Sequence, residues 1–368
     1  MKPIICKIIV TLITLAALVS THPIAYLSDE KFSWEKVSDQ PVLGINGDIP
    51  NKSIILIKDN ENQISAFDWQ KRKYIWHVAL PDASGIFRWS PDQKIIASIS
   101  NGTIQIFDAL TGQHFDELEK SINQTSKPFL GEIGYADLRW RPSSNELTIL
   151  TDFNILTYSS DSGKLLQRVK LPGFDKLTGS PSPSYFDWSP DGKRLALAQV
   201  KTSDSEPVYP LQVVLGIWDK DGKWLNDYDE RSSTESCIPA SSAVYRGNET
   251  FFSFYVAWSP YNTTLAVSMP YSGYQLCTFG DDNSIEVQSI PTSQYAQEIS
   301  WSPDGRWLAN AGNNCLITIA DANNNYSLTD TQLDSTDCVF HTFQWSKDSL
   351  SLMVGTEDGL WIGKVSNG

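Results

Sequence analysis

Six stretches of the chain share one pattern of apolar and polar positions. Each has a short run that ends at a tryptophan, then a polar turn, then a second apolar run, as in FRWSPDQKIIASIS and ISWSPDGRWLANAG. The tryptophans are Trp89, Trp140, Trp188, Trp258, Trp301 and Trp345. Proline fixes φ at about −65° in a turn, and glycine accepts the positive φ at which a chain reverses. The pattern therefore predicts six β-hairpins.

The hairpins belong to a longer repeat. Successive tryptophans lie 51, 48, 70, 43 and 44 residues apart, so the period is about 45 residues with one large insertion. A third strand with its own turn follows several hairpins, at Gly102–Gln113, Asn154–Leu165, Val213–Leu225 and Leu316–Leu328. A fourth run, for example Leu165–Leu171, closes the unit. Four short strands per repeat and no helical-period stretch predict an all-β fold, a radial β-propeller of four-stranded antiparallel blades.

The number of blades depends on the region before the first tryptophan phrase. A degenerate unit there raises the count to a seven-bladed ring, with strands at Pro41–Ile45, Lys52–Lys58, Gln63–Trp69 and Lys73–Leu80. The last unit has only three strands of its own, since Gly359–Val365 is its third. We expect Lys31–Val37 to complete that blade as an N-terminal closing strand, because such a closure removes an open sheet edge.

Two motifs carry a resemblance to a known family. The phrase W-S-P-D-G-(K/R)-x-L-A and the third-strand phrase at Gly102–Asp108 and Ile217–Asp219 resemble those of WD-repeat (WD40-type) propellers, over about residues 30–368. TolB-like propellers share W-S-P-D-G and are the near relative. The Gly-His pair of WD repeats is missing, and the terminal Trp-Asp is intact only at Trp218–Asp219, so that family's buried hydrogen-bond network is not carried over. The resemblance implies a non-catalytic ring that binds a protein or peptide, which is an analogy at the level of the fold.

Connectivity assigns the connections between strands to two faces of the ring. In a four-stranded meander, the turns after the first and third strands lie on one face, and the connections after the second and fourth strands lie on the other. The first kind is short, as at Asp191–Gly192 and Asp304–Gly305, and we call its side the short-turn face. The second kind forms the long-loop face, with added length in Glu119–Gly134, Gly173–Ser184, Lys201–Pro210, Asp229–Glu249 and Pro270–Asp282. Binding residues concentrate on such loops.

Eight aromatic residues of the long-loop face are the candidate binding residues. They are Phe129, Tyr135, Phe174, Tyr185, Tyr209, Tyr245, Tyr271 and Tyr274. Large aromatic side chains recur at protein interfaces because they offer a wide apolar area and, in tyrosine, a polar end. The alternative is that they only hold the long loops against the ring.

Four cysteines in the body of the chain test this assignment of faces. Sequence alone leaves three disulfide connectivities open. The predicted topology places all four on the long-loop face in two neighbouring pairs, which predicts disulfides Cys237–Cys277 and Cys315–Cys338. An exported protein permits disulfides, and each would add about 2–4 kcal/mol of stability. The alternative is that some of these residues are buried thiols.

The N-terminal segment indicates export. Residues 1–25 combine Lys2 and Lys7 with an apolar stretch of twelve residues, Ile8–Val19, which is typical of a signal peptide and short for a membrane span. An uncleaved N-terminal anchor is the alternative, and only then would the protein contact a membrane. Residues 26–368 are predicted to form one propeller domain, a monomeric ring that is secreted, periplasmic or on the cell surface.

Composition and motifs exclude several classes of function. Lys and Arg total 29 against 43 Asp and Glu, a net charge of −14, which argues against nucleic acid as a partner. The four histidines lie in different repeat units, and neither a zinc motif nor a nucleophile elbow is present. We therefore predict no catalytic residue, no metal and no cofactor.

Three functions fit this interpretation. The first is a non-catalytic scaffold that binds a protein or peptide through its long-loop face. The second is a hydrolase or lyase at the central channel, which would need polar residues on the innermost strands, where the phrases show mostly apolar ones. The third is a module that binds carbohydrate or a cell surface through the loop aromatics. We expect the first.

Overall fold

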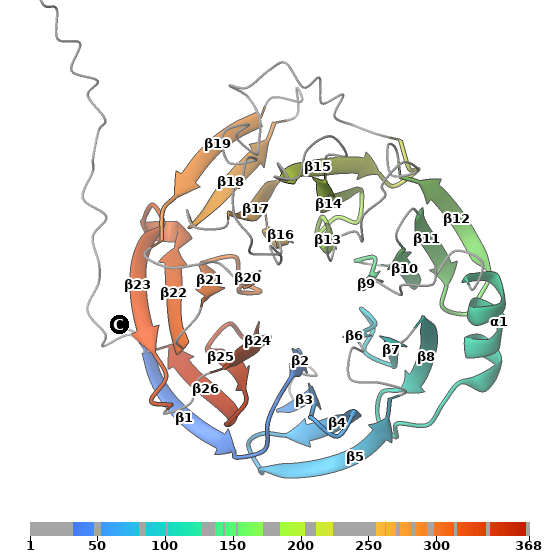
Figure 1. The fold of residues 1–368 in the computed structure, drawn as a ribbon, viewed down its shortest axis with the longest axis horizontal. Coiled ribbons are helices and arrows are strands. Elements are labelled where there is room, and N and C mark those ends of the chain that lie inside the picture. Colours follow the sequence, from blue (N-terminus) through green and yellow to red (C-terminus); the bar gives the residue numbers. More distant parts are fainter. Residues whose placement is uncertain are drawn as a thin grey trace, which may run out of the picture.

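The repeat folds as a ring of seven antiparallel sheets (Figure 1). The structure, a computed structural model, describes residues 32–47, 53–80, 86–100, 102–126, 137–142, 144–151, 154–171, 185–202, 211–223, 255–261, 263–269, 273–280, 285–292, 298–312, 315–335 and 339–365. Each sheet is one blade, and its strands succeed one another from the axis of the ring to the rim. The predicted all-β, seven-bladed propeller is confirmed.

The blades are numbered along the chain, and their strands are named here by position. The innermost strands are β2 (Gly44–Asn46), β6 (Ile86–Trp89), β9 (Asp137–Trp140), β13 (Tyr185–Trp188), β16 (Val256–Trp258), β20 (Glu298–Trp301) and β24 (Phe340–Trp345). The second strands are β3 (Ile54–Lys58), β7 (Ile95–Ser100), β10 (Glu146–Leu150), β14 (Arg194–Thr202), β17 (Thr264–Met269), β21 (Trp307–Ala311) and β25 (Ser351–Thr356). The third strands are β4 (Gln63–Asp68), β8 (Thr103–Asp108), β11 (Asn154–Ser159), β15 (Leu211–Asp219), β18 (Gly273–Phe279), β22 (Leu316–Asp321) and β26 (Gly359–Val365). The outer strands are β5 (Lys73–Ala79), β12 (Leu165–Lys170), β19 (Ile285–Ile290), β23 (Ser327–Gln332) and β1 (Phe32–Ser38).

The turn after the innermost strand is built by a serine and an aspartate. In blade two, Ser90 Oγ donates to Asp92 Oδ1 at 2.7 Å and accepts a hydrogen bond from the amide of Ile95 at 3.1 Å. The same serine–aspartate bond recurs at 2.5–2.7 Å in three more blades, in Ser189–Asp191, Ser302–Asp304 and Ser346–Asp348. The same compact turn therefore recurs in four blades on the short-turn face.

The repeated tryptophans join neighbouring blades. Their rings are largely buried, and three indole N–H groups donate to a backbone carbonyl of the preceding blade: Trp140 to Arg88 at 3.1 Å, Trp301 to Ala257 at 3.2 Å, and Trp345 to Ser300 at 3.2 Å. The accepting residue is in each case the one directly before that blade's own tryptophan. One position of the repeat thus supplies both apolar area and a hydrogen bond between blades.

The N-terminal strand closes the ring as predicted. β1 pairs antiparallel with β26, from Phe32 opposite Val365 to Ser38 opposite Leu360, so the two ends of the described chain share one blade (Figure 1). Phe32 is buried, and the indole of Trp34 donates to Thr331 Oγ1 of blade six at 2.8 Å. The closing strand therefore contacts both its own blade and the preceding one.

A helix covers the outer edge of blade two, which the sequence analysis did not predict. α1 (Asp116–Ser126) lies along β8 at the rim (Figure 1). Its Glu119 accepts from the amide of Ile106 at 2.8 Å, and its Asn123 accepts from the amide of Ile104 at 2.9 Å. Two side chains one helical turn apart thus satisfy amides that a fourth strand would otherwise bond. The expectation that a long loop begins at Glu119 is wrong, because helix continues through Ser126.

Blade five corrects a second predicted loop. Residues 270–282 were expected to form one long connection, but β18 occupies most of it and pairs with β17 and β19. The segment alternates Tyr274, Leu276 and Thr278 with Gln275, Cys277 and Phe279, and nearly all of these side chains are buried. Continuous burial on both sides hid the strand, because it lacks the alternation of a half-exposed one.

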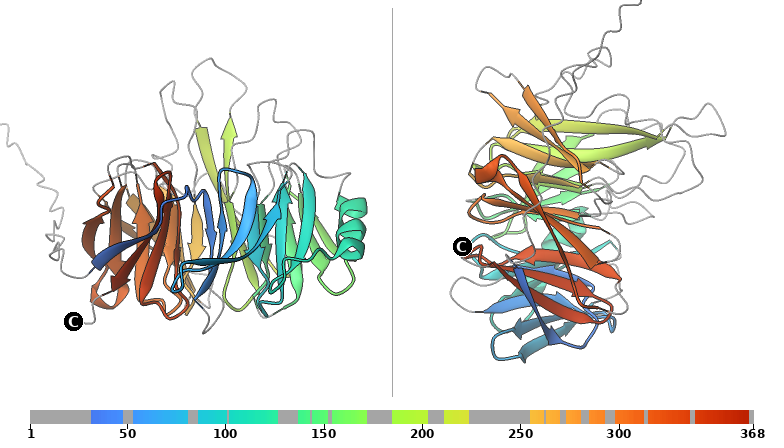
Figure 2. Two further views of the ribbon diagram at one scale, coloured as in Figure 1. Left: turned by 90° about the horizontal axis from the view of Figure 1, so that it is seen from below. Right: turned by 90° about the vertical axis from the view of Figure 1, so that its left-hand side faces the viewer.

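The two faces of the ring differ in the strands that reach them. β14 and β15 have nine residues each and stay paired as far as Thr202 opposite Leu211. Seen from the side, they project past the other strands on the side of the second-to-third connections, which is the long-loop face (Figure 2).

Among the residues described, no helix is both long enough and apolar enough to cross a membrane.

Candidate functional site at the axis of the ring

The innermost strands carry different side chains on their two sides. In β13, Phe186 and Trp188 are buried between blades, whereas Tyr185 and Asp187 keep part of their surface exposed. Side chains alternate along a strand, so the residues one and three positions before the repeated tryptophan share the side that the tryptophan does not occupy. In every blade, these two positions of the innermost strand therefore face away from the packing between blades.

Charged residues at these positions converge on the axis. They form what we call the axial cluster: Arg88 of blade two, Asp137 and Arg139 of blade three, Asp187 of blade four and Glu298 of blade six. Arg88 interacts electrostatically with Asp187 and Glu298, which belong to blades that are not its neighbours, so these side chains approach one another across the ring. The expectation that the innermost strands are mostly apolar at this point is wrong.

Two carboxylates of the cluster hold the innermost strand of the next blade. Asp187 accepts from the amide of Trp188 at 3.0 Å and from that of Trp258 at 2.9 Å, while Glu298 Oε2 accepts from the amide of Phe343 at 3.2 Å. Burial raises the pKa of Asp187 to about 6 and the pKa of Glu298 to about 7, in spite of these bonds and the nearby arginines. Both groups therefore change charge near neutral pH.

The two arginines of the cluster have different surroundings. Arg139 donates to Asp137 Oδ1 at 2.6 Å and to the carbonyl of Leu138 at 2.9 Å, and its guanidinium lies 5.7 Å from the centre of the Phe186 ring. Arg88 donates to the carbonyl of Phe87 at 2.9 Å and forms no ion pair with any described carboxylate. Burial, followed by repulsion from Arg139, lowers the pKa of the Arg88 guanidinium to about 10, so it remains a cation at neutral pH.

Two tyrosines lie where the innermost strands of blades four and five begin. Tyr185 is the first residue of β13, and Tyr255 directly precedes β16. Their ring centres are 3.9 Å apart, and the Tyr255 hydroxyl donates to the Tyr185 hydroxyl at 2.9 Å. Burial and the neighbouring Tyr185 raise the pKa of Tyr255 well above its usual value. Because innermost strands start at the long-loop face, this pair lies on the long-loop side of Asp187.

Of the eight predicted binding aromatics, the structure describes two. Tyr185 lies beside the axial cluster, so the structure brings this candidate to the axis. Tyr274 is wrong as a surface residue: it lies in β18 and only 1% of it is exposed, because it packs in the core with Leu276 and Ile290. The other six, Phe129, Tyr135, Phe174, Tyr209, Tyr245 and Tyr271, lie outside the described residues.

The predicted disulfides each have one described cysteine. Cys277 lies within β18 and not in a loop, which corrects its predicted place, and Cys315 directly precedes β22. Both side chains are buried. Cys237 and Cys338 lie outside the described residues, so the pairings Cys237–Cys277 and Cys315–Cys338 stay predictions.

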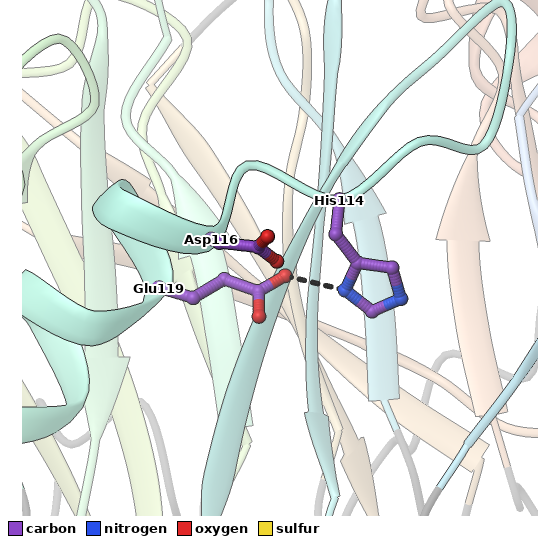
Figure 3. A group of neighbouring side chains, drawn as sticks. All are labelled: His114, Asp116 and Glu119. Atoms are coloured by element: carbon purple, nitrogen blue, oxygen red, sulfur yellow. Dashed lines mark hydrogen bonds and ion pairs between the residues drawn. The ribbon is translucent and has the colours of Figure 1, made fainter.

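A histidine and two acids gather at the start of α1. His114, Asp116 and Glu119 bring one potential metal ligand each within 4.8 Å of one another, and His114 Nδ1 lies 2.8 Å from Glu119 Oε1 (Figure 3). The same Glu119 oxygen already accepts from the amide of Ile106. We therefore assign this group to the attachment of α1, where the carboxylate bonds strand and histidine together.

Comparison with known proteins adds no relative. No protein-family model matches the chain, and no curated protein matches it. The resemblance to WD-repeat and TolB-like propellers therefore depends on the tryptophan phrases and the third-strand phrases of this sequence.

Proposed function

We propose that this protein is a non-catalytic scaffold that binds a protein or peptide on the long-loop face, over the axis of the ring. The observation that carries the proposal is the asymmetry of the innermost strands. Their ends on the short-turn face enter compact serine–aspartate turns, while their starts carry the Tyr185–Tyr255 pair and lead to the axial cluster. A rigid ring that presents aromatic and charged groups on one side is suited to hold an extended segment.

Export belongs to the same proposal. The signal-like residues 1–25 and the predicted disulfides are the features that support it, and both involve residues outside the described part of the chain. In this proposal the mature ring acts outside the cytoplasm, and it contacts a membrane only if the N-terminal segment is retained.

The experiment compares two tyrosines on opposite faces. Tyr185→Ala removes a ring from the long-loop side, and Tyr261→Ala removes a ring that is 73% exposed in the turn between β16 and β17, on the short-turn face. Partners are captured from an extract of cells that produce the protein. The dissociation constant of a captured partner is then measured for the wild type and for both variants. We expect Tyr185→Ala to weaken binding at least about tenfold and Tyr261→Ala to leave it unchanged. Equal affinities of all three proteins would contradict the proposal.

Hydrolysis or lyase chemistry at the axis is a second candidate, which one observation favours. Glu298 has a pKa of about 7, the range in which a carboxyl group works as a general acid or base. Its Oε2 is bonded to the amide of Phe343, which favours a structural role. Turnover of any substrate by the wild type, lost in a stably folded Glu298→Gln variant, would favour catalysis over the scaffold.

A further inference from the structure

Arg88 is the cation of the axial cluster that forms no ion pair with a described carboxylate. A guanidinium has five N–H donors, and the structure assigns one donation from Arg88, to the carbonyl of its own neighbour Phe87. No described carboxylate lies within ion-pair distance of it, although the side chain is half-buried at the centre of the protein. Burying a cation without a partner costs free energy, so such a residue needs an explanation beyond folding.

The neighbouring blade shows what a completed pair looks like. Arg139 occupies the position of Arg88 one blade later, directly before the tryptophan, and its partner Asp137 is two residues upstream on the same strand. The position equivalent to Asp137 in blade two is Ile86. Blade two therefore repeats the arginine without its acid.

The other acids of the cluster do not replace that partner. Both oxygens of Asp187 accept backbone amides, and Glu298 Oε2 accepts the amide of Phe343. These bonds hold the two carboxylates against their own and the next blade. The carboxylates therefore interact with Arg88 electrostatically, without an ion-pair contact. No residue in the described part of the chain accepts from the remaining Arg88 donors, which are therefore available to a ligand.

We propose that Arg88 binds a carboxylate of the ligand, which an acidic peptide presents at the axis of the ring. The planar fork of a guanidinium matches the two oxygens of a carboxylate, and such a bidentate pair is among the strongest contacts available in a protein. The Tyr185–Tyr255 pair lies on the long-loop side of Asp187, so the peptide reaches the axis from that face. This inference rests on the proposed scaffold function and names the chemical group that the scaffold recognises.

The charge of the site depends on pH. Among the described residues, the charged groups that act on Arg88 are Asp137 and Arg139 of β9, Asp187 of β13 and Glu298 of β20, and the adjacent strands β2 and β7 carry none. Tyr255 interacts in turn with Tyr185, Glu298 and Asp137. Between about pH 8 and pH 5, Glu298 and Asp187 gain protons, and the cluster changes from one net negative to one net positive charge. Acidification therefore favours the bound carboxylate.

The experiment titrates small probes against the full protein and follows the Arg88 Nε–H signal by ¹⁵N NMR. The probes are acetyl-Gly-Gly-Asp-Gly-Gly-amide, its Asn counterpart, acetyl-Gly-Gly-Gly with a free carboxyl end, and inorganic phosphate. We expect the aspartate peptide or the free carboxyl end to shift the signal, and the Asn peptide to leave it unchanged. The two carboxylate probes distinguish an acidic side chain from a C-terminus. Affinity is expected to rise at least about tenfold from about pH 8 to about pH 6.

Three variants separate the site from general effects of charge. Arg88→Met is expected to weaken carboxylate binding at least about tenfold, and Arg88→Lys, which keeps the charge but not the fork, by a smaller factor. Arg72→Met, which removes an exposed arginine that pairs with Glu35 at the rim, is the matched control and is expected to bind like the wild type. Arg88→Met also removes a half-buried charge that has no ion-pair partner among the described residues, so its melting temperature is expected to equal or exceed that of the wild type.

Specific outcomes would overturn the proposal. They are equal binding of the aspartate peptide by the wild type and Arg88→Met, no shift of the Arg88 signal by either carboxylate probe up to about 20 mM, or a response to phosphate alone. Failure of the scaffold proposal gives a different result: the probes bind at Arg88, but affinity for the captured partner does not depend on Tyr185.

Discussion

The two sides of one innermost strand behave differently around the ring. On the side between blades, the tryptophan recurs in six blades and its indole N–H repeatedly bonds the preceding blade. On the side toward the axis, the residue directly before the tryptophan differs between most blades. It is arginine in blades two and three (Arg88 and Arg139), aspartate in blade four (Asp187), and alanine, serine and glutamine in blades five, six and seven. The sequence repeat is therefore regular at the positions buried between blades and variable at the positions that face the axis.

This difference shows how one strand serves both stability and recognition. A residue between blades must fit the same gap in every blade, so its identity repeats. A residue at the axis faces six other blades across a shared space, so its best partner depends on the whole ring. We call the residues of the strands that are buried between blades the inter-blade layer. The following predictions test whether the inter-blade layer and the axial cluster contribute separately, the first to stability and the second to recognition.

The largest effect is expected from removal of the closing strand. Deleting residues 26–40 removes β1, exposes the edge of β26 and takes Phe32 and Trp34 from the inter-blade layer. We expect a loss of at least about 5 kcal/mol, comparable to the whole stability of a domain. Urea and thermal unfolding measure it, with Glu35→Gln, a change of an exposed side chain in β1, as the control. An unchanged melting temperature in the deletion would show that closure is not needed.

The next test separates the two sides of β24. Trp345→Ala removes a fully buried ring and its bond to Ser300, and we expect a loss of about 3–5 kcal/mol in the free energy of unfolding. Gln344→Ala changes the adjacent residue on the axis side and is expected to cost no more than about 1 kcal/mol. Similar losses in the two variants would break the distinction between the layers.

A third test uses the pH dependence of the axial cluster. The pKa of Glu298 is raised to about 7, so the folded protein binds a proton there more tightly than the unfolded chain does. Stability at this site is therefore greatest at low pH and is lost as the pH rises toward the folded pKa. Glu298→Gln removes the cost of burying the charged carboxylate. The stability of this variant relative to the wild type should therefore increase by about 2 kcal/mol from about pH 5 to about pH 8.

The control for this measurement is Glu286→Gln, which changes an exposed glutamate in the outer strand β19. Its difference from the wild type should stay flat over the same range of pH. If urea unfolding gives a pH-independent difference for Glu298→Gln as well, the raised pKa of Glu298 is contradicted.

The smallest effect concerns the short-turn face. Gln93 has φ of 61° where the matching turns of blades four and six have Gly192 and Gly305, both at 64°. Gln93→Gly should relieve this strain and stabilise the protein by about 0.5–1 kcal/mol. Gly192→Ala should act in the opposite direction, because its added Cβ would lie 2.9 Å from the carbonyl oxygen of Pro142. A loss of stability in Gln93→Gly, measured by thermal unfolding, would contradict the interpretation.

Much of the fold could be predicted from residues that act locally. The turn at Ser302–Asp304 and the hairpin around it depend on neighbours in the chain, so the sequence contains their whole cause. The helix α1 was missed because its two useful side chains, Glu119 and Asn123, are polar and form bonds to β8, which no hydrophobic period reveals. Strand β18 was missed because both of its sides are buried.

The candidate site had one signal in the sequence, and it was not recognised. The residue before the tryptophan is charged in three consecutive phrases, FRW, LRW and FDW, at a position that alternation places opposite the tryptophan. Of the two predicted binding aromatics that the structure describes, Tyr185 lies beside the axial cluster and Tyr274 lies in the core.

The sequence by itself determined the hairpins, the seven units, the order of the strands and the closure by the N-terminal strand, because each follows from contacts close along the chain or from a repeated pattern. Only the tertiary structure decided which residues meet at the axis. Arg88 and Glu298 are 210 positions apart in a chain of 368, and nothing local relates them. The curvature of the whole ring brings them together, and the same curvature leaves Arg88 beside acids that are already bonded to other blades.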